Sequence, residues 1–200
     1  MLLCESAAGV AVVTLDRPTK GNALDEALVE ALFEAIDTAI TDEETHTLVL
    51  ASSGRNFCTG FDLSDLATQS DGDLLRRFVA VEELLATLWH APIRTVALAA
   101  GRAWGAGADL FTCCDLRIAA PDASFTFPGA RFGLVLGTRR LASVVGETNA
   151  LQIIGEGAVL DVAAAEAVGL VKAYLQEKPD VIAGMESEPE PLAIGRTTYA

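Results

Sequence analysis

Basic residues, histidines and long apolar runs are all scarce in this 200-residue sequence. Fourteen Lys and Arg side chains stand against 28 Asp and Glu, which gives a net charge of −14. Nucleic-acid binding depends on clustered Lys and Arg, so we expect no nucleic-acid partner. No apolar stretch reaches the roughly 18 residues that a membrane-spanning helix needs, so we expect no membrane partner. An anionic small ligand stays compatible with the charge, because it responds to the local field of its pocket.

Metal-binding and disulfide patterns are also lacking. The chain has four cysteines, two of them adjacent, with no CxxC pair, and its only histidines are His46 and His90. This composition argues against a zinc cluster, so we predict no metal site and reduced thiols. The start of the chain has no basic segment followed by a long apolar core. Together these features predict a cytoplasmic protein.

The order of apolar patterns predicts an α/β fold. β-Branched or continuously apolar runs indicate strands, and apolar residues at spacings of three and four indicate amphipathic helices. Strands that alternate with helices favour largely parallel pairing, and the length suits one domain. The predicted strands are 10–15, 47–51, 93–99 and 116–120, and the predicted helices are 25–40, 74–90, 138–154 and 161–168.

Two segments, 55–63 and 101–110, follow predicted strands and lead toward predicted helices. Free N–H groups at a helix start can hold an anion, and glycines allow a ligand to approach the backbone. Glycine content alone favours ordinary tight turns at both places. Neither GxGxxG, a phosphate-binding P-loop nor GxSxG is present, which argues against a dinucleotide site, a nucleotide triphosphatase and an α/β-hydrolase.

Four segments, in order, carry a resemblance to a known family. They are TLDRP with NAL (14–18 and 22–24), FCTGFDL (57–63), the stretch from Pro92 to Ala120, and GLV (169–171). On these motifs the sequence resembles the enoyl-CoA hydratase/isomerase (crotonase) family from about Val10 to Val171. The resemblance implies a crotonase (ClpP-like) ββα-repeat superhelix over residues 1–175. It also implies a shortened C-terminal helical region, of which 176–200 would be the start, and a homo-oligomer, either a trimer or a hexamer.

The resemblance implies a substrate and a site. The substrate would be an acyl-CoA thioester, with CoA carried as part of it and no separate cofactor. Phe61 and Ala106 would donate backbone N–H groups to the thioester oxygen, and Asp109, where the family has glutamate, would be the acid/base group. The second family glutamate falls at Gly129, which has no side chain. The residues expected near CoA are Arg17, Lys20, Ala23, Cys58, Gly60 and Gly105.

Some of these positions also have ordinary structural interpretations. Arg17 and Lys20 fit solvated surface roles equally well, Cys58 fits a small buried apolar residue, and Asp109 fits a helix-terminal acid. With one carboxylate, we expect double-bond isomerisation or another single-acid/base reaction rather than hydration, which needs an activated water as well as a proton donor. The alternative is a weak or inactive member that binds acyl-CoA or a partner chain.

Overall fold

The computed structural model describes residues 1–134 and 136–174, and a six-stranded sheet lies at its centre. The order across this sheet is β1-β2-β3-β4-β6-β9, with β1 antiparallel to β2 and the other pairs parallel. Its strands are β1 (Leu2–Ala7), β2 (Val10–Leu15), β3 (Thr47–Ser52), β4 (Arg94–Ala99), β6 (Leu116–Ala119) and β9 (Ala173–Tyr174). A smaller sheet joins β5 (Arg102–Trp104), β7 (Ser124–Thr126) and β8 (Leu160–Asp161).

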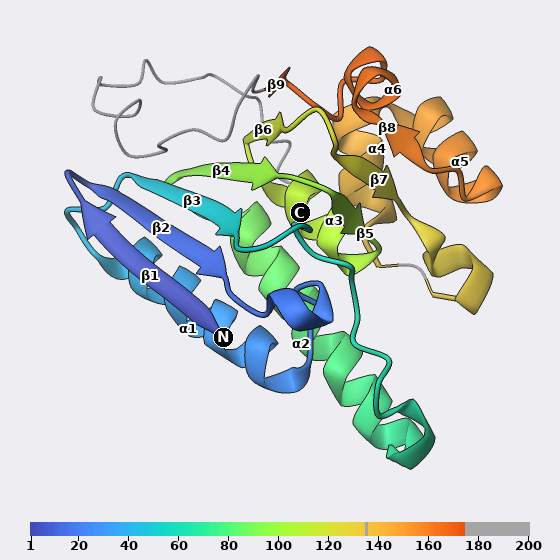
Figure 1. Cartoon of the computed structure of the whole chain (residues 1–200), viewed down its shortest axis with the longest axis horizontal. Coiled ribbons are helices and arrows are strands. Elements are labelled where there is room, and N and C mark those ends of the chain that lie inside the picture. The colour runs from blue at the N-terminus through green and yellow to red at the C-terminus, as the bar shows by residue number, and fades with distance from the viewer. Residues whose placement is uncertain (135, 175–200) are drawn as a thin grey trace.

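Helices connect the strands and cover the larger sheet. They are α1 (Glu26–Thr41), α2 (Asp71–Trp89), α3 (Ala106–Cys113), α4 (Thr138–Val145), α5 (Glu147–Glu156) and α6 (Val162–Ala167). Figure 1 shows α1 and α2 along one face of the larger sheet, and α5 and α6 at the end away from β1. None of the described helices is long and apolar enough to span a membrane.

Side-chain alternation along the strands divides the core into two parts. In β2, Ala11, Val13 and Leu15 join the main cluster with residues of α1, α2 and α3, whereas Val10 and Val12 pack on the opposite face with Val49 and Val96. This period of two is the expected geometry of a strand with apolar side chains on both faces. The register places Val12 opposite Val49, which aligns the two apolar rows of β2 and β3.

Most predicted elements are present within a few residues of their predicted ends, and the α/β prediction is confirmed. One helix prediction is wrong: 138–154 is two helices, α4 and α5, separated at Gly146. This residue has φ 84° and ψ 152°, a conformation that glycine tolerates and that breaks a helix. The predicted C-terminal segment, 176–200, lies outside the described residues.

Candidate active site

Two backbone segments meet beneath the site, and isolated bridges orient the first of them. The Leu24 N–H donates to the Gly60 carbonyl at 2.7 Å, and the Asp62 N–H donates to the Leu24 carbonyl at 2.9 Å. Because successive N–H groups of extended backbone point to opposite sides, the Phe61 N–H points away from Leu24. It has no hydrogen-bond acceptor among the described residues. The sequence suggested a helix start here, but the bridge pattern is what leaves this N–H unpaired.

The second segment ends β5 and begins α3. Gly105 precedes the helix with φ 53° and ψ −126°, a backbone conformation open to glycine. Ala106 is the first residue of α3, so its N–H is one of those that a helix leaves without an intrahelical acceptor. No other group in the described part of the chain accepts a hydrogen bond from the Ala106 N–H.

The two segments touch through glycines. A Cβ built on Gly60, which has φ 95°, would lie 2.7 Å from the Trp104 oxygen and 3.5 Å from the Ala106 nitrogen. A Cβ on Gly107 would overlap the Cys58 carbonyl oxygen and lie 2.8 Å from the Cys58 carbonyl carbon. Side chains at either position would therefore push α3 away from the 57–61 segment. Only this close approach brings the unpaired Phe61 and Ala106 N–H groups into one neighbourhood.

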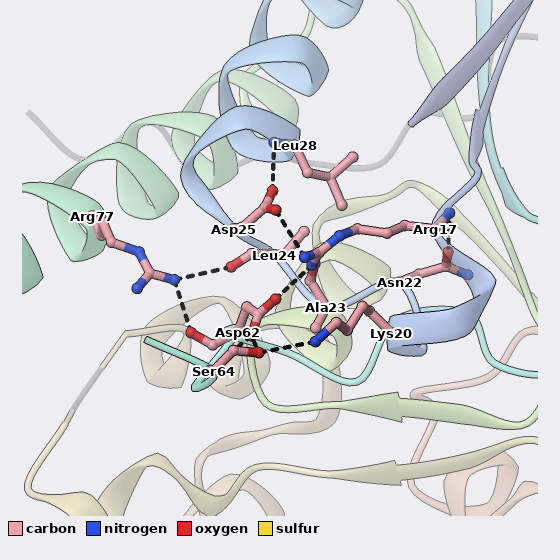
Figure 2. Close-up of polar contacts among 10 residues, drawn as sticks. All are labelled: Arg17, Lys20, Asn22, Ala23, Leu24, Asp25, Leu28, Asp62, Ser64 and Arg77. Carbon is pink, nitrogen blue, oxygen red and sulfur yellow. Dashed lines mark hydrogen bonds and ion pairs between the residues drawn. The ribbon is translucent and has the colours of Figure 1, made fainter. Parts of the chain in front are cut away.

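An ion-pair network fixes the residue that follows Phe61 (Figure 2). Arg17 Nη1 donates to Asp62 Oδ2 at 2.6 Å and to the Ala23 carbonyl at 2.8 Å, and Arg17 Nη2 lies 3.0 Å from Asp25 Oδ2. The Ser64 N–H and hydroxyl both donate to Asp62 Oδ1. Burial opposes ionisation of Asp62, but the Ser64 hydrogen bonds and Arg17 outweigh it and lower the pKa of Asp62 to about 2.

Helix α2 holds the same loop from the other direction. The Arg77 guanidinium lies 4.0 Å from the centroid of the Phe61 ring, and the Phe78 ring stacks on Phe61 with centroids 4.5 Å apart. Arg77 Nη2 donates to the Asp62 carbonyl at 2.9 Å, as Figure 2 shows, and more weakly to the Leu24 carbonyl. The Phe61 segment is thus held by contacts to the Phe61 ring and to the carbonyl groups of Asp62 and Leu24.

Asp109 lies on α3 one turn beyond Ala106, so both residues lie on one face of the helix. Asp109 is 8 % exposed, and its carboxylate makes no hydrogen bond to the described residues. Burial raises the pKa of Asp109 to about 7; nearby Arg140 lowers it and Glu82 raises it. A carboxyl group that titrates near neutral pH can both accept and donate a proton there.

No carboxylate extends from position 129. A Cβ built on Gly129 would lie 2.9 Å from the Leu134 carbonyl oxygen, and the Leu134 N–H donates to the Gly129 carbonyl at 2.9 Å. The turn around the 3₁₀-helix Pro128–Phe132 therefore closes on the place where a side chain would begin.

The residues predicted to lie near CoA differ in exposure and in hydrogen bonding. Lys20, exposed, has Nζ 3.5 Å from the Ser64 hydroxyl; Gly60 and Gly105 lie at the contact between the two segments. The Arg17 guanidinium donates a hydrogen bond to the Ala23 carbonyl and forms ion pairs with two carboxylates, those of Asp25 and Asp62. Cys58 is 0 % exposed, and both its backbone groups pair with the 102–104 strand. Burial raises the pKa of its thiol to about 12.

Sequence reasoning missed three charged residues around this site: Arg77, Glu82 and Arg140. Glu82 follows Phe78 by four positions and precedes Leu85 by three, which places it beside the apolar stripe of α2 rather than on its solvated side. The position of Glu82 in the sequence therefore indicated that its side chain faces the protein rather than the solvent. The partners of Arg77 are largely backbone carbonyls, which a sequence pattern does not reveal.

The sequence is similar to those of known proteins. The family model described as enoyl-CoA hydratase/isomerase matches residues 5–183. A zebrafish (Danio rerio) protein, enoyl-CoA hydratase domain-containing protein 3, mitochondrial, is 31% identical over 98% of this chain and 66% of its own length. A second zebrafish relative, ethylmalonyl-CoA decarboxylase, is 32% identical over 84% of this chain and 57% of its own length. The chain thus spans less than two thirds of either relative.

Solved structures agree with the fold. A Bordetella parapertussis protein assigned as an enoyl-CoA hydratase/isomerase aligns with TM-score 0.86 and 45% identity, over 88% of this chain and 73% of that one. The enoyl-CoA hydratase of Bacillus anthracis aligns with TM-score 0.83 and 26% identity, over 87% and 69%. The crotonase fold predicted from the motifs is therefore confirmed. The chain belongs to the enoyl-CoA hydratase/isomerase family.

Proposed function

We propose that this chain acts on an acyl-CoA thioester and stabilises the enolate that forms from it. The observation that carries the proposal is the pair of unpaired N–H groups, on Phe61 and Ala106, which the contact between Gly60 and the start of α3 brings together. In this proposal both N–H groups donate to the thioester oxygen. That oxygen gains negative charge only as the enolate forms, so fixed donors lower the transition state more than they stabilise the substrate.

Asp109 is the proposed acid/base group, and isomerisation of a double bond is the proposed reaction. Its carboxylate takes a proton from C2 of a 3-enoyl-CoA, the electron pair spreads over the dienolate, and the same group returns the proton to C4. The double bond moves from C3 to C2, and no other reactant is needed. A pKa of about 7 suits both half-reactions, because the group accepts and releases a proton with similar ease.

Hydration is disfavoured in this proposal because it adds a water that must be positioned and deprotonated. The second family glutamate is replaced by Gly129, and the Leu134 carbonyl occupies the space where a side chain would start. One protonatable group therefore has to suffice.

CoA is carried as part of the substrate in this proposal, with no separate cofactor. In this proposal Lys20 is the cation that contacts the CoA phosphates. The backbone around Ala23, Gly60 and Gly105 is proposed to lie beside the bound CoA. Arg17 acts instead as a positioning residue for Asp62, since its guanidinium is already paired. We also propose a homo-oligomer, a trimer or hexamer, that works in the cytoplasm.

The test uses the full chain with a 3-enoyl-CoA and a 2-enoyl-CoA, followed by ultraviolet absorbance and product chromatography. Ala106→Pro removes one N–H at the first helical position, where proline is well tolerated. We expect its turnover to fall by about 10²–10³-fold, the usual loss for one such donor. Ala106→Gly is the matched control, because it keeps the N–H, and it should retain turnover. Equal rates in the proline and glycine variants would refute the assignment of the donors.

The second candidate is a member that binds acyl-CoA, or a partner chain, without turnover, and the lack of a side chain at Gly129 favours it. Calorimetric titration with a saturated acyl-CoA separates the two candidates. Saturable binding with no conversion of either enoyl-CoA would favour the binder. Conversion of the 3-enoyl-CoA that exceeds hydration of the 2-enoyl-CoA would favour the enzyme.

A further inference from the structure

Asp109 is enclosed by two neighbouring helices as well as by its own. Helix α3 packs against α2 on one side and α4 on the other. Gly137, the residue before α4, lies directly against the Asp109 carboxyl group: a Cβ built there would overlap Oδ1 and lie 2.5 Å from Cγ. The amino end of α4 therefore faces this carboxyl group.

An ion pair joins the same two helices. Arg140, in the first turn of α4, makes a two-pronged contact with Glu82 of α2: Nη1 donates to Oε2 at 3.0 Å and Nη2 to Oε1 at 2.6 Å. The Arg140 side chain is only 13% exposed, and that of Glu82 is 44% exposed. Such paired geometry fixes both side chains more firmly than a single contact. The pair connects α2 to α4, the two helices that enclose α3.

The charges that act on Asp109 come from the two neighbouring helices. Arg140 of α4 and Glu82 of α2 influence it with opposite signs. On α3 itself, Cys113 lies one turn beyond Asp109, and burial raises the pKa of its thiol well above the ordinary value, so it stays neutral. The net influence of the surroundings thus depends on how far Glu82 offsets the positive charge of Arg140.

We propose that Glu82 and Arg140, whose ion pair joins the two helices packed against α3, are positioning residues that together set the charge around the buried carboxyl group of Asp109. This inference deepens the proposed function, in which Asp109 transfers the proton. An unopposed Arg140 would keep Asp109 ionised and too weak a base. An unopposed Glu82 would keep it protonated, so that no base would be available. The pair holds the group between these two states.

The two single variants give opposite predictions. Glu82→Gln leaves Arg140 uncompensated and should lower the pKa of Asp109 by about half a unit or more. Arg140→Gln leaves Glu82 uncompensated and should raise it by a similar amount. Both variants break the same contact, so a merely structural role would move Asp109 in the same direction in both. The double variant should return the pKa toward that of the parent.

The measurement is a ¹³C NMR titration of the full, unliganded chain with labelled aspartate, in which Asp109→Asn identifies the signal. Glu83→Gln is the matched control: Glu83 neighbours Glu82 on α2 but is exposed, and its removal should leave the titration of Asp109 unchanged. Opposite shifts in the two single variants support the inference. Shifts of one sign, or shifts no larger than in Glu83→Gln, overturn it.

A second readout separates this inference from the proposed reaction. If Asp109 is the base, the acidic limb of the kcat/KM pH profile for the 3-enoyl-CoA should move with the NMR titration in each variant. Opposite NMR shifts without any movement of that limb would preserve the inference about the ion pair. The same result would remove Asp109 from the proposed reaction.

Discussion

Asp109→Asn should stabilise the fold at alkaline pH while it removes the proposed acid/base group. In the native state this carboxyl group is buried and makes no hydrogen bond to the described residues, so ionisation there is unfavourable. In the unfolded chain it ionises freely. Because burial raises the native pKa above the unfolded value, the native state keeps a proton that the unfolded state has released. Stability must therefore fall as pH rises from about 4 to about 7, and stay level above that.

The size of the effect follows from the two pKa values. The native value of about 7, against an ordinary 3.8, corresponds to at most about 4 kcal/mol at 1.4 kcal/mol per pKa unit. Between about pH 5 and about pH 8.5, the part of the free energy of unfolding that Asp109 contributes should fall by roughly 3 kcal/mol. An asparagine at this position does not titrate. Groups that do not interact with Asp109 titrate alike in both proteins, so subtraction removes their contribution.

Urea denaturation of parent and variant at these two pH values measures the difference. The advantage of Asp109→Asn over the parent should grow by about 2–3 kcal/mol from the lower to the higher pH, while turnover falls by about 10²–10⁴-fold. Asp62→Asn is the matched control with the opposite sign, because the pKa of Asp62 is lowered to about 2. It should destabilise the fold near neutral pH by about 2 kcal/mol. A pH-independent difference between Asp109→Asn and the parent would refute the raised pKa.

Two further substitutions and one measurement test other parts of the molecule. Gly107→Ala should lower the free energy of unfolding by about 1–3 kcal/mol, because the added methyl group meets the Cys58 carbonyl; urea denaturation checks it. Gly129→Glu should raise hydration relative to isomerisation in the paired enoyl-CoA assays, with Gly129→Ala as the control for the contact with Leu134. Self-association as a trimer or hexamer should appear in sedimentation velocity at micromolar concentration, and a monomer there would contradict it.

Local sequence patterns account for much of the fold. The β-branched run of β2 and the four-residue spacing in α1 lead directly to the observed elements, because β2 buries apolar side chains on both faces and α1 buries one apolar face. Strand β1 was not predicted, since five of its six residues are exposed and carry no apolar alternation. Its place is fixed by pairing with β2. The split of 138–154 at Gly146 depends on a backbone angle that periodicity does not report.

The candidate site was only partly predictable for a related reason. The motifs indicated Phe61 and Ala106, and the structure adds why their N–H groups are unpaired: one by strand geometry, the other by a helix start. Asp109 was indicated by the family resemblance, because it stands where the family has glutamate. The residues that act on it, Glu82 and Arg140, lie on other helices, and contacts between distant segments leave little trace in a local pattern.

In the proposed reaction one proton-transfer group has to serve, and the environment of Asp109 supports this. Glu82 is the other described carboxylate that influences it, and both oxygens of Glu82 are bonded to Arg140. Breaking that pair to free a second base would leave the Arg140 side chain, which is 13% exposed, without its partner. In our proposal Glu82 therefore acts through its charge on the carboxyl group of Asp109. The same burial that makes Asp109 unfavourable for stability raises its pKa to the range in which a single group can take up and return a proton.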